Sequence, residues 1–85
     1  YLGTCDYDAL DVAIAAYEAK VADKDNYSNW AEYEAAYTAA KAVTRNMVAD
    51  EAGANQATID AATKALLDAK AALLSKEILV SVVRV

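Results

Sequence analysis

Proline is absent from the 85 residues, and glycine occurs only at Gly3 and Gly53. Because these two residue types interrupt helices most often, almost nothing inside the chain breaks a helical segment. Alanine is abundant; it is the strongest helix former and lets helices pack closely. A chain of this length has room for one domain with one modest core. The composition therefore predicts a small all-α domain.

Histidine is also absent, and Cys5 is the only cysteine. This excludes catalytic triads that use histidine and zinc sites built from thiolates and imidazoles. Catalysis by paired carboxylates needs a concave, desolvated site, which a slim bundle does not offer. A single cysteine cannot crosslink the chain to itself, which leaves an incidental thiol or an intermolecular role. We therefore expect no enzymatic activity, no metal site and no cofactor.

Positive charge is scarce, with eight Lys and Arg residues scattered among thirteen Asp and Glu residues. Nucleic acids need clustered basic residues, and anionic membrane surfaces need them too, so neither is an expected partner. The longest apolar stretch, in residues 78–85, is far shorter than the roughly 20 residues of a membrane helix. We therefore expect no membrane insertion. No signal peptide is visible, and we expect a chain that opens at Tyr1 to be a fragment.

The first helix is predicted over residues 7–23. Asp6 or Asp8 is suited to cap its amino end. Apolar residues then recur at alternating steps of three and four, which draws one stripe along a helix. The stripe consists of Tyr7, Leu10, Ile14, Tyr17 and Val21.

The second helix is predicted over residues 29–47, after a polar break at 23–26. Asn29 and Glu32 have the spacing of a capping box, in which two side chains satisfy the first free N–H groups of a helix. The apolar stripe of this helix contains Trp30, Tyr33, Tyr37, Ala40, Val43 and Met47.

The third helix is predicted over residues 56–75, after a loop at 50–55 that contains Gly53. Asn55 is suited to cap it. Asp60, Lys64 and Asp68 lie four apart on its solvated face, where such pairs contribute about 0.2–0.5 kcal/mol each. The apolar stripe contains Ile59, Ala62, Leu66, Ala69 and Leu73.

Three stripes joined by short loops predict an antiparallel three-helix bundle. Residues 1–6 form a lead-in, 7–75 the module, and 76–85 a tail whose β-branched residues favour a strand. No other strand candidate is present, so the tail is expected to begin a following domain or to pair with another chain. The core residues that we expect are Leu10, Ile14, Tyr17, Trp30, Tyr37, Ile59, Leu66 and Leu73.

The second and third helices also carry a resemblance to a known family. One reads Trp30-x-x-Tyr33-x-x-Ala36-Tyr37-x-x-Ala40, and the other Asn55-Gln56-x-x-Ile59-Asp60-x-Ala62 followed by Leu66 and Leu73. Over residues 9–74 the chain resembles the FIVAR (Found In Various ARchitectures) module, with a Ser-Trp-x-x-Leu-x-x-Ala-Leu second helix and a Thr-Gln-x-x-Val-Asp-x-Ala third helix. Tyr33 and Tyr37 stand where the family has leucines, which thickens the core or exposes hydroxyl groups. Asn29 replaces the family's serine.

This resemblance implies an accessory module of a large secreted, cell-wall or cell-surface protein from Gram-positive bacteria. Such modules lie between catalytic, carbohydrate-binding and immunoglobulin-like domains of carbohydrate-active enzymes and adhesins. The expected partners are therefore neighbouring domains of the parent protein.

A calcium loop and an aromatic ligand patch are two further interpretations of the residues. Asp23, Asp25 and Glu34 have the spacing of a calcium-binding loop, but Tyr27 and Ser28 occupy positions that need an oxygen ligand and a glycine, which favours a solvated turn. Most aromatic residues lie at core spacing. Tyr27 falls in a loop, so a ligand patch is sought at Tyr27, Asn29 and the Tyr33 hydroxyl.

The sequence thus favours a non-catalytic spacer and interaction module. The alternative is a module that binds a glycan or an extracellular host protein through surface tyrosines. A third hypothesis is a docking subunit whose tail adds a strand to a partner sheet.

Overall fold

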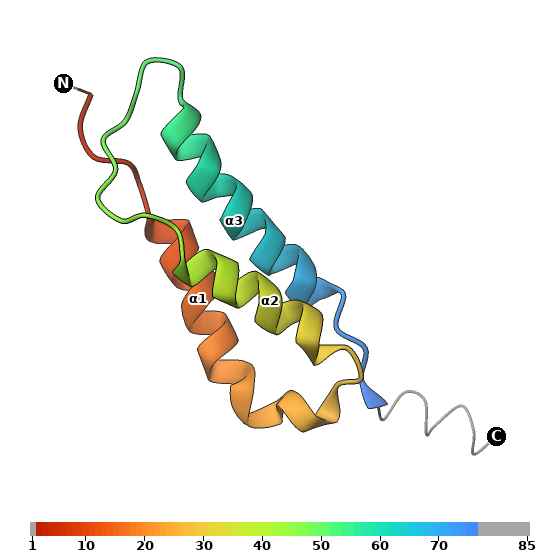
Figure 1. The fold of residues 1–85 in the computed structure, drawn as a ribbon. Helices are drawn as coiled ribbons and strands as arrows, with labels where there is room; N and C mark the ends of the chain where they lie inside the picture. Colours follow the sequence, from red (N-terminus) through yellow and green to blue (C-terminus); the bar gives the residue numbers. More distant parts are fainter. Residues whose placement is uncertain (1, 77–85) are drawn as a thin grey trace.

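The computed structural model describes residues 2–76 of the chain and places them in three packed helices (Figure 1). Helix α1 spans Asp8–Lys20 and continues into the 3₁₀ helix η1, Val21–Asn26. Helix α2 spans Trp30–Lys41, and α3 spans Ala54–Ala71. Helices α1 and α3 run in the same direction, and α2 runs against both (Figure 1). The predicted all-α three-helix bundle is confirmed.

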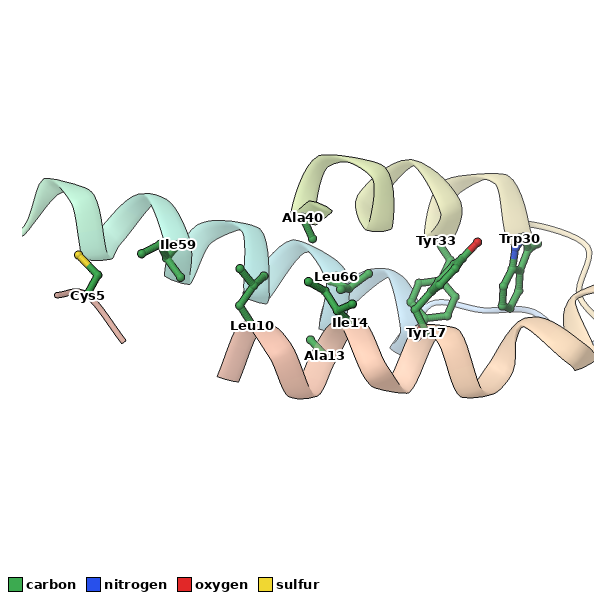
Figure 2. Close-up of a cluster of buried hydrophobic side chains, with 10 residues drawn as sticks. All are labelled: Cys5, Leu10, Ala13, Ile14, Tyr17, Trp30, Tyr33, Ala40, Ile59 and Leu66. Carbon is green, nitrogen blue, oxygen red and sulfur yellow. The ribbon is translucent and has the colours of Figure 1, made fainter. Parts of the chain in front are cut away.

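The core lies between the inward faces of the helices and extends along the bundle (Figure 2). Leu10, Ile59 and Leu66 are almost completely buried, and burial of such a side chain contributes roughly 1.5–3 kcal/mol. Ile14, Tyr17 and Trp30 are also buried, as the spacing predicted. Tyr37 and Leu73 are only partly buried and pack against this core.

The predicted helix ends differ from the observed ones. Helix α2 ends at Lys41 rather than near residue 47, and residues 42–53 form a long connection instead. Val43 and Met47 still pack against the core. Their apolar spacing therefore predicted their contact with the core correctly but not their secondary structure. Val21 lies in η1 and is 37% exposed, because the tighter 3₁₀ turn rotates it off the stripe.

The predicted helix caps are also corrected. Asn29 precedes α2 but makes no capping bond to it, because its side chain reaches α3 instead. The carboxylate of Asp50 accepts hydrogen bonds from the N–H groups of Ala54 and Asn55, so Asp50 satisfies the amino end of α3 in place of Asn55. Gly53 precedes that helix with φ 72°, a left-handed conformation that glycine adopts without strain.

Residues 2–6, predicted as a lead-in outside the module, belong to the bundle. Cys5 is 7% exposed and lies beside α3 at the end of the core that also holds Ile59 (Figure 2). The N–H of Cys5 donates to the Met47 carbonyl at 2.9 Å, and the N–H of Ala49 donates to the Gly3 carbonyl at 2.8 Å. The predicted β-like tail at 77–85 lies outside the described residues.

Candidate functional site

Of the three residues predicted as a ligand patch, Tyr27 and Asn29 lie where η1 meets α2, whereas Tyr33 lies within α2. Tyr27 is half-buried and forms an antiparallel β-bridge with Ser75. The Lys20 ammonium group lies 5.3 Å from the centroid of the Tyr27 ring, and the ring of Trp30 lies 6.0 Å away. The phenol of Tyr27 raises the pKa of Lys20 above its ordinary value. The ring of Tyr27 is therefore engaged by a cation and by a neighbouring aromatic ring.

Asn29 connects the amino end of α2 to the segment that follows α3. Its amide nitrogen donates to the Ala72 carbonyl at 2.9 Å, and its amide oxygen accepts from the Leu74 N–H at 2.8 Å. Beside it, the Ser28 N–H donates to the Leu74 carbonyl at 2.9 Å. Asn29 thus uses both polar atoms of its side chain within the fold, which assigns it a structural task.

Tyr33 lies in the centre of the core and is 0% exposed. Its ring packs edge-on against Tyr17 and Trp30, with centroids 4.8 and 5.0 Å apart (Figure 2). Such pairs contribute about 0.5–1.5 kcal/mol beyond their buried area. Burial raises the pKa of the Tyr33 hydroxyl, and the hydroxyl has no hydrogen-bond partner among the described residues. Tyr33 is a core residue here and does not reach the surface beside Tyr27.

Tyr37 is the second tyrosine at a position where the FIVAR pattern has leucine, and its environment differs from that of Tyr33. Its ring stacks on Tyr17 at a centroid distance of 3.9 Å and an interplanar angle of 13°. Its hydroxyl donates to the Glu18 carboxylate at 2.8 Å, which raises the pKa of Tyr37. The two tyrosines therefore divide the expected effects: Tyr33 thickens the core and Tyr37 exposes a hydroxyl that connects α2 to α1.

A shallow surface hollow of about 330 Å³ opens beside Tyr27. Two lysines, two carboxylates, one hydroxyl and the edge of the aromatic cluster line it, so its charges are balanced. The lining residues are Lys24, Asp25, Tyr27, Ser28, Trp30, Ala31, Glu34 and Lys76. Tyr27 is the one predicted ligand residue that lies in this hollow.

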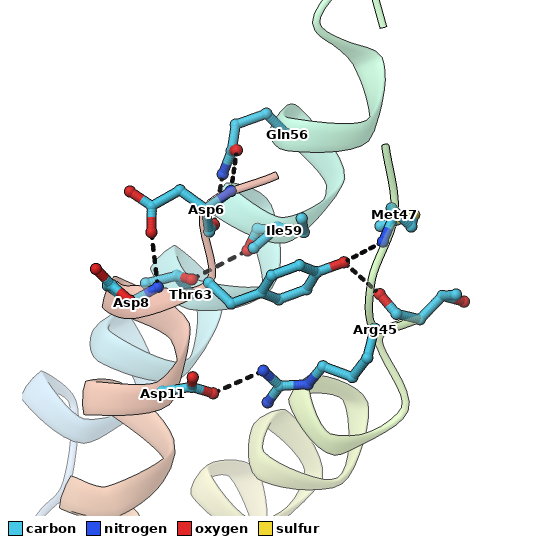
Figure 3. A network of polar contacts seen from close by, with 10 residues as sticks. Asp6, Asp8, Asp11, Arg45, Met47, Gln56, Ile59 and Thr63 are labelled. Carbon is cyan, nitrogen blue, oxygen red and sulfur yellow. Dashed lines mark hydrogen bonds and ion pairs between the residues drawn. The ribbon is translucent and has the colours of Figure 1, made fainter. Parts of the chain in front are cut away.

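The opposite end of the bundle carries a polar network that the sequence pattern did not predict (Figure 3). The side-chain amide of Gln56 accepts from the Asp6 N–H at 2.8 Å and donates to the Asp6 carbonyl at 2.9 Å. The Tyr7 hydroxyl donates to the Thr44 carbonyl at 2.7 Å and accepts from the Met47 N–H at 3.0 Å. These bonds fix the segment before α1 to α3 and to the α2–α3 connection.

Arg45 adds an ion pair to this network. Its guanidinium group lies 2.7 Å from the Asp11 carboxylate and 5.0 Å from the centroid of the Tyr7 ring. Both partners are solvent-exposed, so the ion pair contributes at most about 1 kcal/mol. Among the residues of this network, only Gln56 belongs to the FIVAR-like sequence pattern, and that pattern does not predict its contact with Asp6.

Chemistry-bearing side chains do not gather in the described part of the chain. Among residues 2–76, no three Cys, Asp or Glu side chains lie close enough to hold a metal ion. No helix within that range is long and apolar enough to cross a membrane. The arrangement at both bundle ends consists instead of side chains that hold backbone segments together.

No protein-family model matches the chain, and neither a curated protein nor a solved structure does. The resemblance to the FIVAR module therefore stays a prediction.

Proposed function

We propose that this chain is a non-catalytic spacer and interaction module of a secreted or cell-surface multimodular protein. The observation that carries the proposal is the position of the two ends of the described chain. The segment before α1 and the segment after α3 lie at opposite ends of an elongated bundle (Figure 1). Neighbouring domains attached at these ends would be held apart by the length of the helices.

The length and the fixed ends both support this role. Helix α3 has 18 residues and therefore spans about 27 Å at 1.5 Å per residue. The segment that enters the bundle is bonded to residues 47–49, and the segment that leaves it is bonded to residues 27–29. A spacer sets the relative position of its neighbours only if its ends do not swing, and these bonds restrain both ends.

The family resemblance supports the biological setting. FIVAR-like modules occur between functional domains of secreted and cell-wall carbohydrate-active enzymes and adhesins, so the proposed partners are domains of the same parent protein. The absence of histidine and the scattered carboxylates support a role without catalysis.

The test is a distance distribution between spin labels at the two ends. Leu2→Cys and Lys76→Cys are labelled in a Cys5→Ala background; both positions are exposed. A spacer gives one narrow distribution. A matched control places the labels at Val12→Cys and Leu67→Cys, two exposed positions on α1 and α3. A broad distribution between positions 2 and 76 beside a narrow control would refute the spacer.

A second candidate is a module that binds a glycan or an extracellular host protein, and the hollow beside Tyr27 favours it. Sugar rings bind to aromatic faces through apolar contact, but Lys20 lies over the ring of Tyr27. Lys20 does not line the hollow itself, so a glycan bound there reaches Tyr27 without displacing Lys20. Lys20→Ala should therefore change the affinity little, while Tyr27→Ala abolishes binding. A glycan array followed by titration of Trp30 fluorescence tests this, and an array without any signal eliminates glycans.

A further inference from the structure

Two short backbone pairings, one at each end of the bundle, join segments that lie far apart in the sequence. The first, which we name the entry clamp, consists of residues 3–5 and 47–49. It contains an antiparallel bridge between Thr4 and Val48. Two backbone hydrogen bonds of 2.8 and 2.9 Å flank the bridge. Figure 1 shows the two segments side by side beyond the end of α1.

The second pairing, which we name the exit clamp, consists of residues 27–29 and 72–75. It contains the antiparallel bridge between Tyr27 and Ser75 and the backbone bond from Ser28 to Leu74. Asn29 adds its two side-chain bonds to the same segment. Each clamp is thus completed by a side chain that bonds both a carbonyl and an N–H: Asn29 at the exit, and Gln56 on Asp6 next to the entry.

The direction of the paired segments determines how a pull along the bundle acts on them. Hydrogen bonds between antiparallel segments lie perpendicular to the segments. The pull reaches each clamp at its outer end, at residues 3 and 75, whereas the partner segment leads into α2 from its inner end, at residues 47 and 29. Tension between the ends therefore shears each clamp and loads its bonds together, rather than opening them one after another.

The clamps also determine which helices carry that tension. Residues 27–29 precede α2, and residues 47–49 follow it after a short connection. Tyr7 and Arg45 fasten that connection to α1. The pull therefore passes from one clamp to the other through α2, in parallel with the packing contacts between α1 and α3. Without the clamps, α1 and α3 would be peeled from the bundle by their free ends.

We infer that the entry and exit clamps let this module transmit tension between its two ends without unfolding. The inference rests on the proposed spacer function, because only a chain joined to neighbours at both ends carries tension. The inference goes beyond the spacer function. A spacer needs only a fixed distance between its ends at rest, whereas resistance to tension also requires that the ends stay fixed under force.

Single-molecule tweezers test the inference on the whole chain, with handles fused to its two ends. Asn29→Ala removes two bonds of the exit clamp. Each bond lost from a sheared clamp lowers the free-energy barrier to unfolding, so we expect unfolding at constant force to become about tenfold faster. The control is a core substitution in α1, Ile14→Val or Ile14→Ala, whichever matches Asn29→Ala in the equilibrium loss of stability measured by urea denaturation. Equal acceleration by both substitutions would overturn the inference.

A second comparison changes the pulling direction and leaves the clamps intact. Handles attached at Asp25→Cys and Lys76→Cys, in the Cys5→Ala background, act on the outer end of the exit clamp and unzip it. Both positions are exposed. We expect unfolding at a clearly lower force than with handles on the two ends of the chain. Equal unfolding forces for the two pulling directions would overturn the inference about the clamps. The spacer function is tested separately, because only a broad distribution of spin-label distances in the absence of force would refute it.

Discussion

The side-chain amide oxygen of Asn29 accepts a hydrogen bond from the backbone N–H of Leu74 at 2.8 Å, across 45 residues of sequence. Helix α3 has already ended there, and the carbonyl and N–H groups that follow lack helical partners. The Asn29 nitrogen satisfies one of these, the Ala72 carbonyl, and its oxygen satisfies another. One side chain from the start of α2 therefore acts as the cap of α3 and fixes two helices at once.

We expect Asn29→Ala to destabilise the fold by about 1–3 kcal/mol, because two hydrogen bonds are lost at about 0.5–1.5 kcal/mol each. Urea denaturation followed by circular dichroism measures this. Amide exchange at Leu74 should accelerate at the same time, because its N–H loses its acceptor.

The matched control is Asn26→Ala in the neighbouring 3₁₀ helix. Asn26 is exposed, and surface substitutions of this kind change stability by at most about 0.5 kcal/mol. Similar losses for both asparagines would show that Asn29 contributes through local turn propensity and not through α3.

Two tyrosine hydroxyls should respond in opposite directions to the same substitution. The Tyr7 hydroxyl makes two hydrogen bonds, to Thr44 and Met47. The Tyr33 hydroxyl is buried without a partner among residues 2–76. We expect Tyr7→Phe to destabilise by about 1–2 kcal/mol, and Tyr33→Phe to be neutral or to stabilise by up to about 1 kcal/mol.

Each of these variants serves as the control for the other, because both remove one oxygen from an aromatic ring. Thermal and urea denaturation of the two variants side by side gives the sign. A loss for Tyr33→Phe as large as that for Tyr7→Phe would contradict the assignment of the Tyr33 hydroxyl as unsatisfied.

The helical positions of the core could be predicted because helical periodicity depends only on local spacing. Apolar residues spaced three or four apart form a stripe along one face of a helix, and that face is buried where helices pack. The buried members of these stripes include Leu10, Ile14, Ile59 and Leu66. Trp30 followed the same rule.

The clamps could not be predicted, because isolated bridges depend on which segments the tertiary fold brings together. Met47 follows the apolar stripe of α2, so spacing alone extended the helix past Lys41. Cys5 and the residues around it show no periodicity, and the burial of Cys5 follows from the position of α3. Asn29 had the spacing of a capping box, but the Ala72 carbonyl and the Leu74 N–H take both polar atoms of its side chain.

Trp30→Ala should destabilise the protein by about 3–5 kcal/mol, because the indole is 9% exposed and contacts three tyrosine rings. That is a large fraction of the stability of a small domain, so the thermal transition should fall steeply or disappear. Trp30→Phe keeps an aromatic ring and should lose less. A melting temperature close to that of the wild type would show that Trp30 does not support the core.

Asp50 should make stability depend on pH in the acid range. Its carboxylate accepts hydrogen bonds from the N–H groups of Asn55 and Ala54, which lower the pKa of Asp50 below the ordinary value of 3.8. Because the folded pKa lies below the unfolded one, the stabilisation is fully present above the unfolded pKa and is lost as the pH falls through the folded pKa.

The measurable quantity is the difference in unfolding free energy between the wild type and Asp50→Asn. Asparagine offers one acceptor but no charge to the amino end of α3, so the wild type should be more stable near neutral pH. Below about pH 4 the carboxyl group of the unfolded chain begins to bind protons, and the difference should shrink until the pH has fallen through the lower pKa of the folded state. Comparing the two proteins at each pH cancels the titration of the other carboxylates. A difference that stays constant down to about pH 2 would mean that hydrogen-bond geometry, and not the charge of Asp50, stabilises the start of α3.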